Sequence, residues 1–300
     1  MIVKNVVSQG YPFLEAIVAA LPLCDEILIS EGYSSDETWP VLQALQKKYP
    51  DKLKLFRDSW NTDINRGPIL AKMTNILKQR CLGDFCLNLQ ANEILHESSL
   101  DEIRYLPVQY PAAEIFFLPF YNIIGSRLIW IADFRKRLFR NKKYIESRGD
   151  AYDLGYKMRH LMRHPGILYR HIMHGSRGTI CYLTEPVYRY RALFPENYLA
   201  KLKALRNRTY LWDKEYLFAQ SVEDQTLHSR RKPEEFWNKM KSFFDGNIFE
   251  DLPPDIHFSP IIPRRCFGEL EKAPKIVGHL LNKWRYNLKD SLEALQIDYP

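Results

Sequence analysis

The sequence predicts an α/β fold, with a mostly parallel β-sheet and helices on both of its faces. Over the first 90 residues, short apolar runs alternate with segments whose apolar residues recur at helical spacing. The links between them are short, and 46% of the 300 residues are hydrophobic, enough for a sizeable core. Parallel strands need crossover helices, so this alternation indicates a parallel sheet with right-handed connections.

Four strands and three helices are expected in this part. The strands are predicted at residues 3–7, 26–30, 53–57 and 85–90. The helices are predicted at 11–21, from possible N-caps at 34–38 to about 49, and from 67 onward. Pro22 ends the first helix, and Pro40 lies near the first turn of the second. We expect the strand ends at Ser30 and Gln90 to share one edge of the sheet, where open α/β sheets bind their ligands.

The pattern changes after residue 98. A short helix at 98–105 and strands at 114–120, 127–131 and 136–140 predict an antiparallel extension of the sheet. Further helices are expected at 195–208, 233–244, 276–284 and 288–295. We therefore predict an α/β domain over residues 1–192 and a mainly helical C-terminal extension, packed on it, over residues 193–300.

The chain is basic, with a formal net charge of +7. Clusters such as Arg135-Lys136-Arg137 could bind a polyanion, an anionic membrane surface or phosphorylated small molecules, or could simply be solvated. No nucleic-acid motif is present, so we expect no nucleic-acid partner. No apolar run reaches the length of a membrane span, and five scattered cysteines favour free thiols in the cytoplasm. Peripheral contact with an anionic membrane stays open.

Polar side chains follow the fourth predicted strand. Gln90, Asn92 and Glu93 come directly after the apolar alternation of residues 85–89. Their carbonyl and carboxylate oxygens suit a hard cation and the phosphates that it carries. The alternative is a buried strand followed by an ordinary polar loop.

Two other segments offer donor-binding groups. Glu31, Ser34 and Asp36 follow the second strand, where a carboxylate can accept hydrogen bonds from a base or a ribose, although Ser34 and Asp36 also suit helix capping. Asn65 and Gly67 precede a helix, where glycine allows close backbone approach and the helix N-terminus attracts phosphate.

Two acids after the basic segment could act as a general base. Asp150 and Asp153 lie beside the flexible Gly149, and an acid here could deprotonate a hydroxyl nucleophile. Helix capping is the alternative for Asp153. The sequence has no nucleophile elbow, no phosphate-binding P-loop, no Gly-x-Gly-x-x-Gly and no His-Glu-x-x-His, which argues against the enzymes that these motifs mark.

Taken in order, these segments resemble glycosyltransferase family 2, which has the GT-A fold. The resemblance covers about the first half of the chain and lies in Tyr11 to Ala16, Leu21 to Glu26, Ser34, Asp36, Thr38, Asn65, Gly67, Ala71, Asn75, Gly83-Asp84 and Gln90 to Glu93. It implies transfer of a sugar, usually with inversion, from a nucleotide-diphosphate donor to a hydroxyl of a glycan or lipid-linked acceptor, as in polysaccharide biosynthesis. It also implies a divalent cation, Mn²⁺ or Mg²⁺, that offsets the charge of the leaving diphosphate.

The same resemblance assigns roles to the candidate residues. Glu31, with Ser34, Asp36, Asn65, Gly67 and Gln90, would bind the nucleotide; Asn92 and Glu93 would hold the metal; Asp150, with Asp153 in reserve, would be the base.

The sequence departs from the family at three positions. Glu31 replaces the usual Asp and keeps the charge, Asn92 replaces an Asp and loses it, and Arg189 stands where relatives tend to have His. Either Arg189 or Arg191 stabilises the diphosphate, or the protein is a non-catalytic homologue that binds a nucleotide sugar or a glycan. We expect the loops of Glu31 and Asn92 to meet around the donor.

Overall fold

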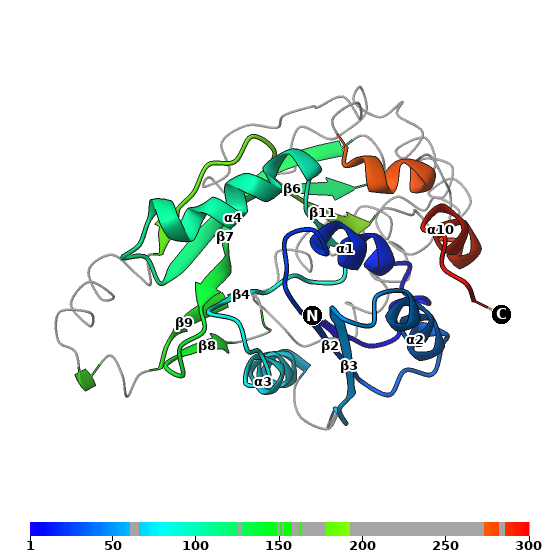
Figure 1. Cartoon of the computed structure of the whole chain (residues 1–300), viewed down its shortest axis with the longest axis horizontal. Helices are drawn as coiled ribbons and strands as arrows, with labels where there is room; N and C mark the ends of the chain where they lie inside the picture. Colours follow the sequence, from blue (N-terminus) through cyan, green and yellow to red (C-terminus); the bar gives the residue numbers. More distant parts are fainter. Residues whose placement is uncertain are drawn as a thin grey trace, which may run out of the picture.

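The computed structural model describes residues 1–60, 66–124, 128–148, 151, 153–157, 162–163, 178–192, 273–281 and 286–299. Within these residues the chain forms an α/β structure with two main sheets and a separate hairpin (Figure 1). Sheet A has three strands in the order β1-β2-β3. Sheet B has six strands, with β4-β7-β6-β11-β5 in order and β10 beside β6.

Sheet A is parallel, as the alternation of strands and helices predicts. Its strands are β1 (Ile2–Val3), β2 (Ile27–Glu31) and β3 (Leu53–Arg57), connected through α1 (Phe13–Ala20) and α2 (Thr38–Lys48). The register pairs Val3 with Glu31 and Glu31 with Arg57. All five residues of β2 are buried, as expected for a central strand that is covered on both faces. The predicted α/β class and its first helices are therefore confirmed.

The helices of this part bury one face each. In α1 the buried residues include Phe13, Leu14 and Ile17, which recur at helical spacing. In α2 the buried residues include Val41 and Leu45, and the last turn carries lysines that complement the helix dipole. A third helix, α3 (Arg66–Lys78), follows β3.

Sheet B corrects the predicted position of the fourth strand. Its members are β4 (Phe85–Leu87), β5 (Glu93–Ile94), β6 (Ile115–Ile124), β7 (Leu128–Arg140), β10 (Thr179–Ile180) and β11 (Val187–Ala192). Strand β4 is shorter than expected, ends before Gln90 and pairs antiparallel with β7. Ser30 lies in β2 of sheet A, so the strand that contains it and the strand that precedes Gln90 belong to different sheets. Apolar alternation reports that a strand is half-buried but does not specify its partner.

The two sheets share one hydrophobic core. A single cluster joins Val3 and Ile29 of sheet A to Phe116 and Leu118 of sheet B. Helix α1 also contacts β5, so it packs between the sheets. Helix α4 (Leu100–Gln109) lies along sheet B (Figure 1), and its Ile103 and Leu106 belong to the same core cluster.

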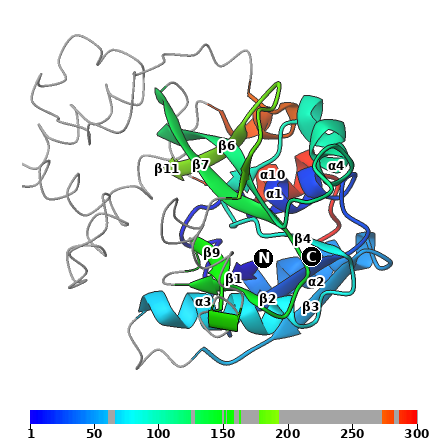
Figure 2. The same cartoon turned by 90° about the vertical axis from the view of Figure 1, so that its left-hand side faces the viewer.

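A hairpin of β8 (Ile145–Arg148) and β9 (Asp153–Tyr156) packs on α3 (Figure 2). The amide of Asn75 holds it through two hydrogen bonds with the backbone of Ser147, at 2.9 Å and 2.8 Å. The same α3 therefore supports both sheet A and the hairpin that leads toward residue 150.

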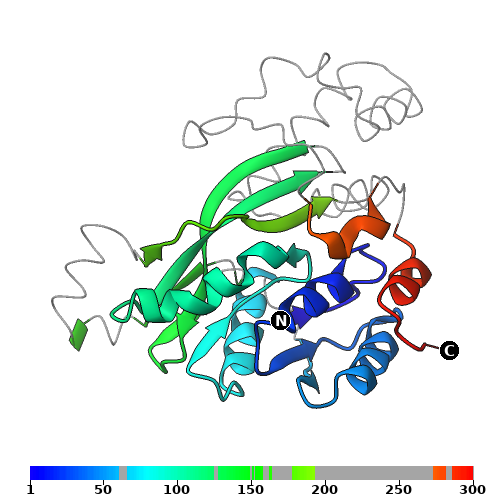
Figure 3. The same ribbon diagram turned by 45° about the horizontal axis from the view of Figure 1, so that its top comes forward.

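The described C-terminal residues pack against the N-terminal helices (Figure 3). They form a 3₁₀ helix, η3 (Lys275–Leu280), and α10 (Leu288–Ala294). His279 lies 2.9 Å from the buried carboxylate of Glu15 in α1, and Lys48 of α2 donates to two carbonyl oxygens after α10. The helix at 288–295 is confirmed, while the segment from 276 is a short 3₁₀ helix. The helices expected at 195–208 and 233–244 lie outside the described residues, so the boundary at residue 192 stays a prediction.

In the part of the chain that the structure describes, no helix combines the length and the apolar character that crossing a membrane requires. Cys24, Cys81, Cys86 and Cys181 carry free thiols, as predicted.

Candidate functional site

The loops at the carboxyl edge of sheet A form the first part of the candidate site. We call residues 4–8, 31–38 and 58–60, together with Arg57, the sheet A rim. Glu31 ends β2 at this rim, and its side chain is 0% exposed. One carboxylate oxygen accepts a hydrogen bond from the backbone N–H of Ser34, and the other accepts from Nε of Arg57 at 2.9 Å. Glu31 thus fixes both the turn after β2 and the guanidinium on β3.

Side chains of the loop after β2 connect it to the loop after β1. Ser34 Oγ accepts from the N–H of Asn5 at 2.8 Å, and Asp36 accepts from the N–H of Ser8 at 2.8 Å. Thr38 Oγ1 accepts from the N–H of Val6 at 3.1 Å. The residues that resemble a nucleotide-binding motif therefore preorganise the rim by holding the loops after β1 and β2 together.

Arg57 lies between two aromatic rings at the rim. Its guanidinium carbon is 4.4 Å from the ring centroid of Tyr33 and 4.8 Å from that of Trp39. The Arg57 side chain is 33% exposed, and Tyr33 projects into solvent from a backbone with φ of 53°. The rim therefore presents a rigid stack of planar groups, on which a further planar ring can stack.

The loop after β3 closes the rim. Asp58 accepts from Ser30 Oγ at 2.7 Å and makes a bidentate ion pair with Arg80 at 2.6 Å and 2.7 Å. The Arg80 guanidinium lowers the pKa of Asp58 below its ordinary value. Trp60 packs directly on Gly32, where a Cβ atom would lie 2.7 Å from the indole ring. Only glycine leaves room for the ring at that position.

A second set of polar residues lies in sheet B. We call Gln90, Glu93, Arg137 and Arg189 the Glu93 cluster. Glu93 and Arg137 are both 0% exposed, and Arg137 binds the two carboxylate oxygens at 2.8 Å and 2.7 Å. The register of β11 and β5 places Arg189 opposite Glu93, with Nε 3.7 Å from the carboxylate and Nη2 3.2 Å from Oε1 of Gln90.

Arg137 reaches Glu93 because it lies at a β-bulge. Phe116 pairs with Leu138 and Phe117 with Lys136, so Arg137 is the extra residue on β7, and a bulge redirects such a side chain. Charge alone predicts that the Arg135-Lys136-Arg137 run is a ligand-binding or solvated surface. Arg137 is instead an internal ion-pair partner, and Lys136 is buried against Phe117. Charged residues inside an otherwise strand-like segment were the one available signal.

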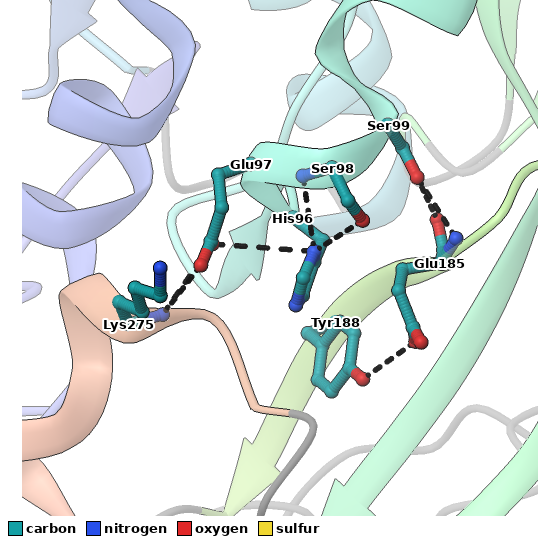
Figure 4. Close-up of polar contacts among 7 residues, drawn as sticks. All are labelled: His96, Glu97, Ser98, Ser99, Glu185, Tyr188 and Lys275. Carbon is teal, nitrogen blue, oxygen red and sulfur yellow. Dashed lines mark hydrogen bonds and ion pairs between the residues drawn. The ribbon is translucent and has the colours of Figure 1, made fainter.

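The segment after β5 is anchored to β11 (Figure 4). Ser99 Oγ donates to the carbonyl of Glu185 at 2.7 Å and accepts from its N–H at 2.9 Å. His96 stacks near Tyr188 with 5.7 Å between ring centroids, and its Nδ1 accepts from the N–H of Ser98 at 3.2 Å. Ser98 and Glu97 both face Nδ1, so these three residues do not form a nucleophile–base–acid relay. The contacts hold β5, and with it Glu93, in place.

Protein groups engage both predicted metal ligands, Asn92 and Glu93. The side-chain amide nitrogen of Asn92 donates to the backbone carbonyl of Tyr190 at 3.0 Å, and the backbone carbonyl of Asn92 accepts from the N–H of Tyr190 at 2.8 Å. Both carboxylate oxygens of Glu93 accept from Arg137. Over the described ranges, no group of three or more His, Cys, Asp or Glu side chains could hold a metal ion. A requirement for Mn²⁺ or Mg²⁺ stays a prediction.

The remaining predicted residues keep their expected roles as predictions. Asn65 and Asp150 lie outside the described residues. Gly67 is in the first turn of α3, and Asp153 begins β9 opposite Arg148. The structure brings Glu31, Ser34 and Asp36 together at the rim, and Gln90, Glu93 and Arg189 together in sheet B. Because Glu31 and Asn92 lie at different sheets, the meeting of their loops also stays a prediction.

No family model matches the sequence, and no curated protein matches it. Among solved structures, the chain is similar to S. aureus TarS at 13% identity and a TM-score of 0.39 over 83% of this chain and 48% of that chain. TarS 1–349 matches at 14% identity and a TM-score of 0.39 (82% of this chain, 78% of that chain), and its complex with UDP at 13% and 0.39 (81% and 69%). This chain thus spans about half the length of the first of these TarS structures. Because the TM-scores are below 0.5, we base no functional conclusion on this overlap.

Proposed function

We propose that this protein is an inverting glycosyltransferase that transfers a sugar from a nucleotide-diphosphate donor to a hydroxyl of a glycan or lipid-linked acceptor. The observation that supports this most is the sheet A rim. Three loops at the carboxyl edge of a parallel sheet are held together by buried side chains, and they present the exposed Tyr33–Arg57 stack. Such edges are where open α/β sheets bind nucleotides.

The described residues suggest how the donor would be held. The Tyr33–Arg57 stack suits the planar base of the nucleoside. Gln90 and Arg189 lie on the side of sheet B, and their polar and charged groups suit the diphosphate. Glu31 acts through Arg57 and the Ser34 turn, so it positions the groups that would meet the base.

The chemistry requires one base. Asp150, or Asp153 in reserve, takes the proton of the acceptor hydroxyl while its oxygen forms a bond to the anomeric carbon. The bond from that carbon to the diphosphate oxygen breaks, and the nucleoside diphosphate leaves with the electron pair. A single displacement of this kind inverts the anomeric centre. The β8–β9 hairpin, held by Asn75, supports the chain on both sides of this acidic turn.

A donor panel tests the proposed activity. Hydrolysis and transfer would be measured across UDP-, GDP-, CDP- and TDP-sugars, with and without Mn²⁺. We expect turnover with at least one donor and a loss of about 100-fold or more for Asp150→Asn, the usual contribution of a general base. The matched control is Asp101→Asn, because Asp101 is an exposed helix residue. Absence of turnover with every donor, or full turnover in both Asp150→Asn and Asp153→Asn, would contradict the proposal.

A non-catalytic nucleotide-sugar or glycan-binding protein is the second candidate. The observation that favours it is the placement of Asn92 and Glu93, both held by protein partners where the family implies metal ligands. Calorimetry showing saturable donor binding, in a preparation without turnover for any donor or acceptor, would select this candidate.

The acceptor and the location follow from the same proposal. We place the reaction in polysaccharide or lipid-linked glycan synthesis in the cytoplasm, with peripheral contact to an anionic membrane as one arrangement. Flotation with phosphatidylglycerol vesicles tests this contact, and phosphatidylcholine vesicles serve as the control.

A further inference from the structure

We infer that Arg189 takes the place of a divalent cation in binding the donor diphosphate, with Glu93 and Arg137 as its positioning residues. The inference rests on the proposed function and specifies how the charged part of the donor is held. Three features of the Glu93 cluster lead to it.

The first feature is the engagement of Glu93. A carboxylate that ligates a cation needs at least one oxygen directed at the ion. Here one oxygen accepts from Nη2 of Arg137, and the other accepts from Nε of Arg137 and from the N–H of Gln90 at 3.1 Å. The Arg137 guanidinium binds the carboxylate in bidentate geometry, which is among the strongest ion-pair arrangements in proteins. Glu93 is therefore an arginine partner.

The second feature is electrostatic. The positions of Arg137 and Arg189 place two guanidinium groups within 4 Å of the same carboxylate. Both guanidinium groups would repel a divalent cation beside Glu93, and the single carboxylate offsets only one of the two positive charges. The same two charges attract a diphosphate. The cluster is thus suited to an anion.

The third feature is the graded exposure of the cluster. Glu93 and Arg137 are 0% exposed, whereas the Arg189 side chain is 11% exposed. Arg189 is also held from two sides, by Glu93 and by the side-chain carbonyl of Gln90. Of the two arginines it is the one that a ligand can reach, and its orientation is set before the ligand arrives.

Calorimetry on the full chain tests the inference. UDP and GDP would be titrated into protein in EDTA and, separately, in excess Mn²⁺. We expect the affinity to differ by less than about twofold between the two buffers. Arg189→Gln should weaken binding by about tenfold or more, as expected when one charge-assisted hydrogen bond is lost. Arg189→Lys keeps the charge without the planar fork and should retain part of the affinity.

Controls separate binding from folding. Arg104→Gln removes an exposed arginine on α4 and should leave the affinity unchanged. Thermal unfolding of each variant shows whether it folds, and the comparison of EDTA with Mn²⁺ on the unaltered chain needs no variant. Binding that requires Mn²⁺ would overturn this inference and leave the proposed function standing. No nucleotide binding in either buffer would contradict the proposed function itself.

Discussion

Glu31 and Glu93 are both completely buried, and each is paired with an arginine, yet their surroundings differ. Arg57, the partner of Glu31, is one-third exposed and lies between two aromatic rings. Arg137, the partner of Glu93, is sealed inside sheet B. The Glu31–Arg57 pair orders the surface of the sheet A rim, whereas the Glu93–Arg137 pair stabilises the interior of sheet B. The same two residue types therefore serve recognition in one sheet and positioning in the other.

This difference predicts that replacing Glu31 and replacing Glu93 with a neutral residue will lower the free energy of unfolding by unequal amounts. Removing one partner from a buried pair leaves an uncompensated buried charge, whereas water can solvate an arginine that is already exposed. The loss of folding free energy should therefore be larger at Glu93 than at Glu31.

Glu93→Gln should lower the free energy of unfolding by about 3–5 kcal/mol, because it leaves the buried Arg137 guanidinium without a countercharge. Urea denaturation followed by circular dichroism measures it. A double variant, Glu93→Leu with Arg137→Met, removes both charges and should be more stable than Glu93→Gln. A loss below about 1 kcal/mol for Glu93→Gln would show that the Glu93–Arg137 pair does not stabilise the interior of sheet B.

Glu31→Gln should cost less, about 2 kcal/mol, since it weakens charge-assisted hydrogen bonds from Ser34 and Arg57 while Arg57 stays in contact with water. The same denaturation experiment gives the value. In addition, we expect weaker nucleotide binding, because the Arg57 stack loses its anchor. A stability loss as great as that of Glu93→Gln would remove the distinction between the two pairs.

Thr38→Val tests the connection between the loops of the rim. Valine has nearly the same shape but leaves the N–H of Val6 without its acceptor. We expect urea denaturation to show a loss of about 1 kcal/mol in the free energy of unfolding. This is the lower end of the usual cost of an unsatisfied buried donor, because the loop can rearrange toward water. Thr38→Ser keeps the oxygen and should lose less, so equal losses in the two variants would show that the hydrogen bond is unimportant.

The Asp58–Arg80 pair predicts a small pH dependence. Arg80 lowers the pKa of Asp58 in the folded chain, so the stabilisation is complete above the ordinary Asp pKa of about 3.9 and is lost as the pH falls through the lower folded-state value. Asp58→Asn should therefore be less stable than the unaltered chain at pH 7, and the gap should close below about pH 4. Melting temperatures of both proteins across this range measure the gap, and a gap that widens with acid would contradict the assignment.

Sequence reasoning predicted the local elements of sheet A well, because each depends on nearby residues. The apolar runs at Ile27 to Ile29 and Leu53 to Leu55 and the helical spacing of Phe13, Leu14 and Ile17 are visible without any partner. The strand at 53–57 has the predicted bounds.

The partners of sheet B could not be predicted in the same way. Strand β4 pairs with residues more than 50 positions later, and Glu93 is paired with an arginine 44 residues away. That arginine depends on a β-bulge in β7, which shifts the register by one residue. Neither alternation nor composition encodes such a shift, so the sequence identified Glu93 as important but assigned it a different role.

Hydrogen–deuterium exchange with mass spectrometry, on the full chain with and without a saturating nucleoside diphosphate, tests the central claim most directly. The account predicts slower exchange at residues 31–38 of the sheet A rim when nucleotide is present. Unchanged exchange there, or protection confined to segments away from the rim, would contradict it.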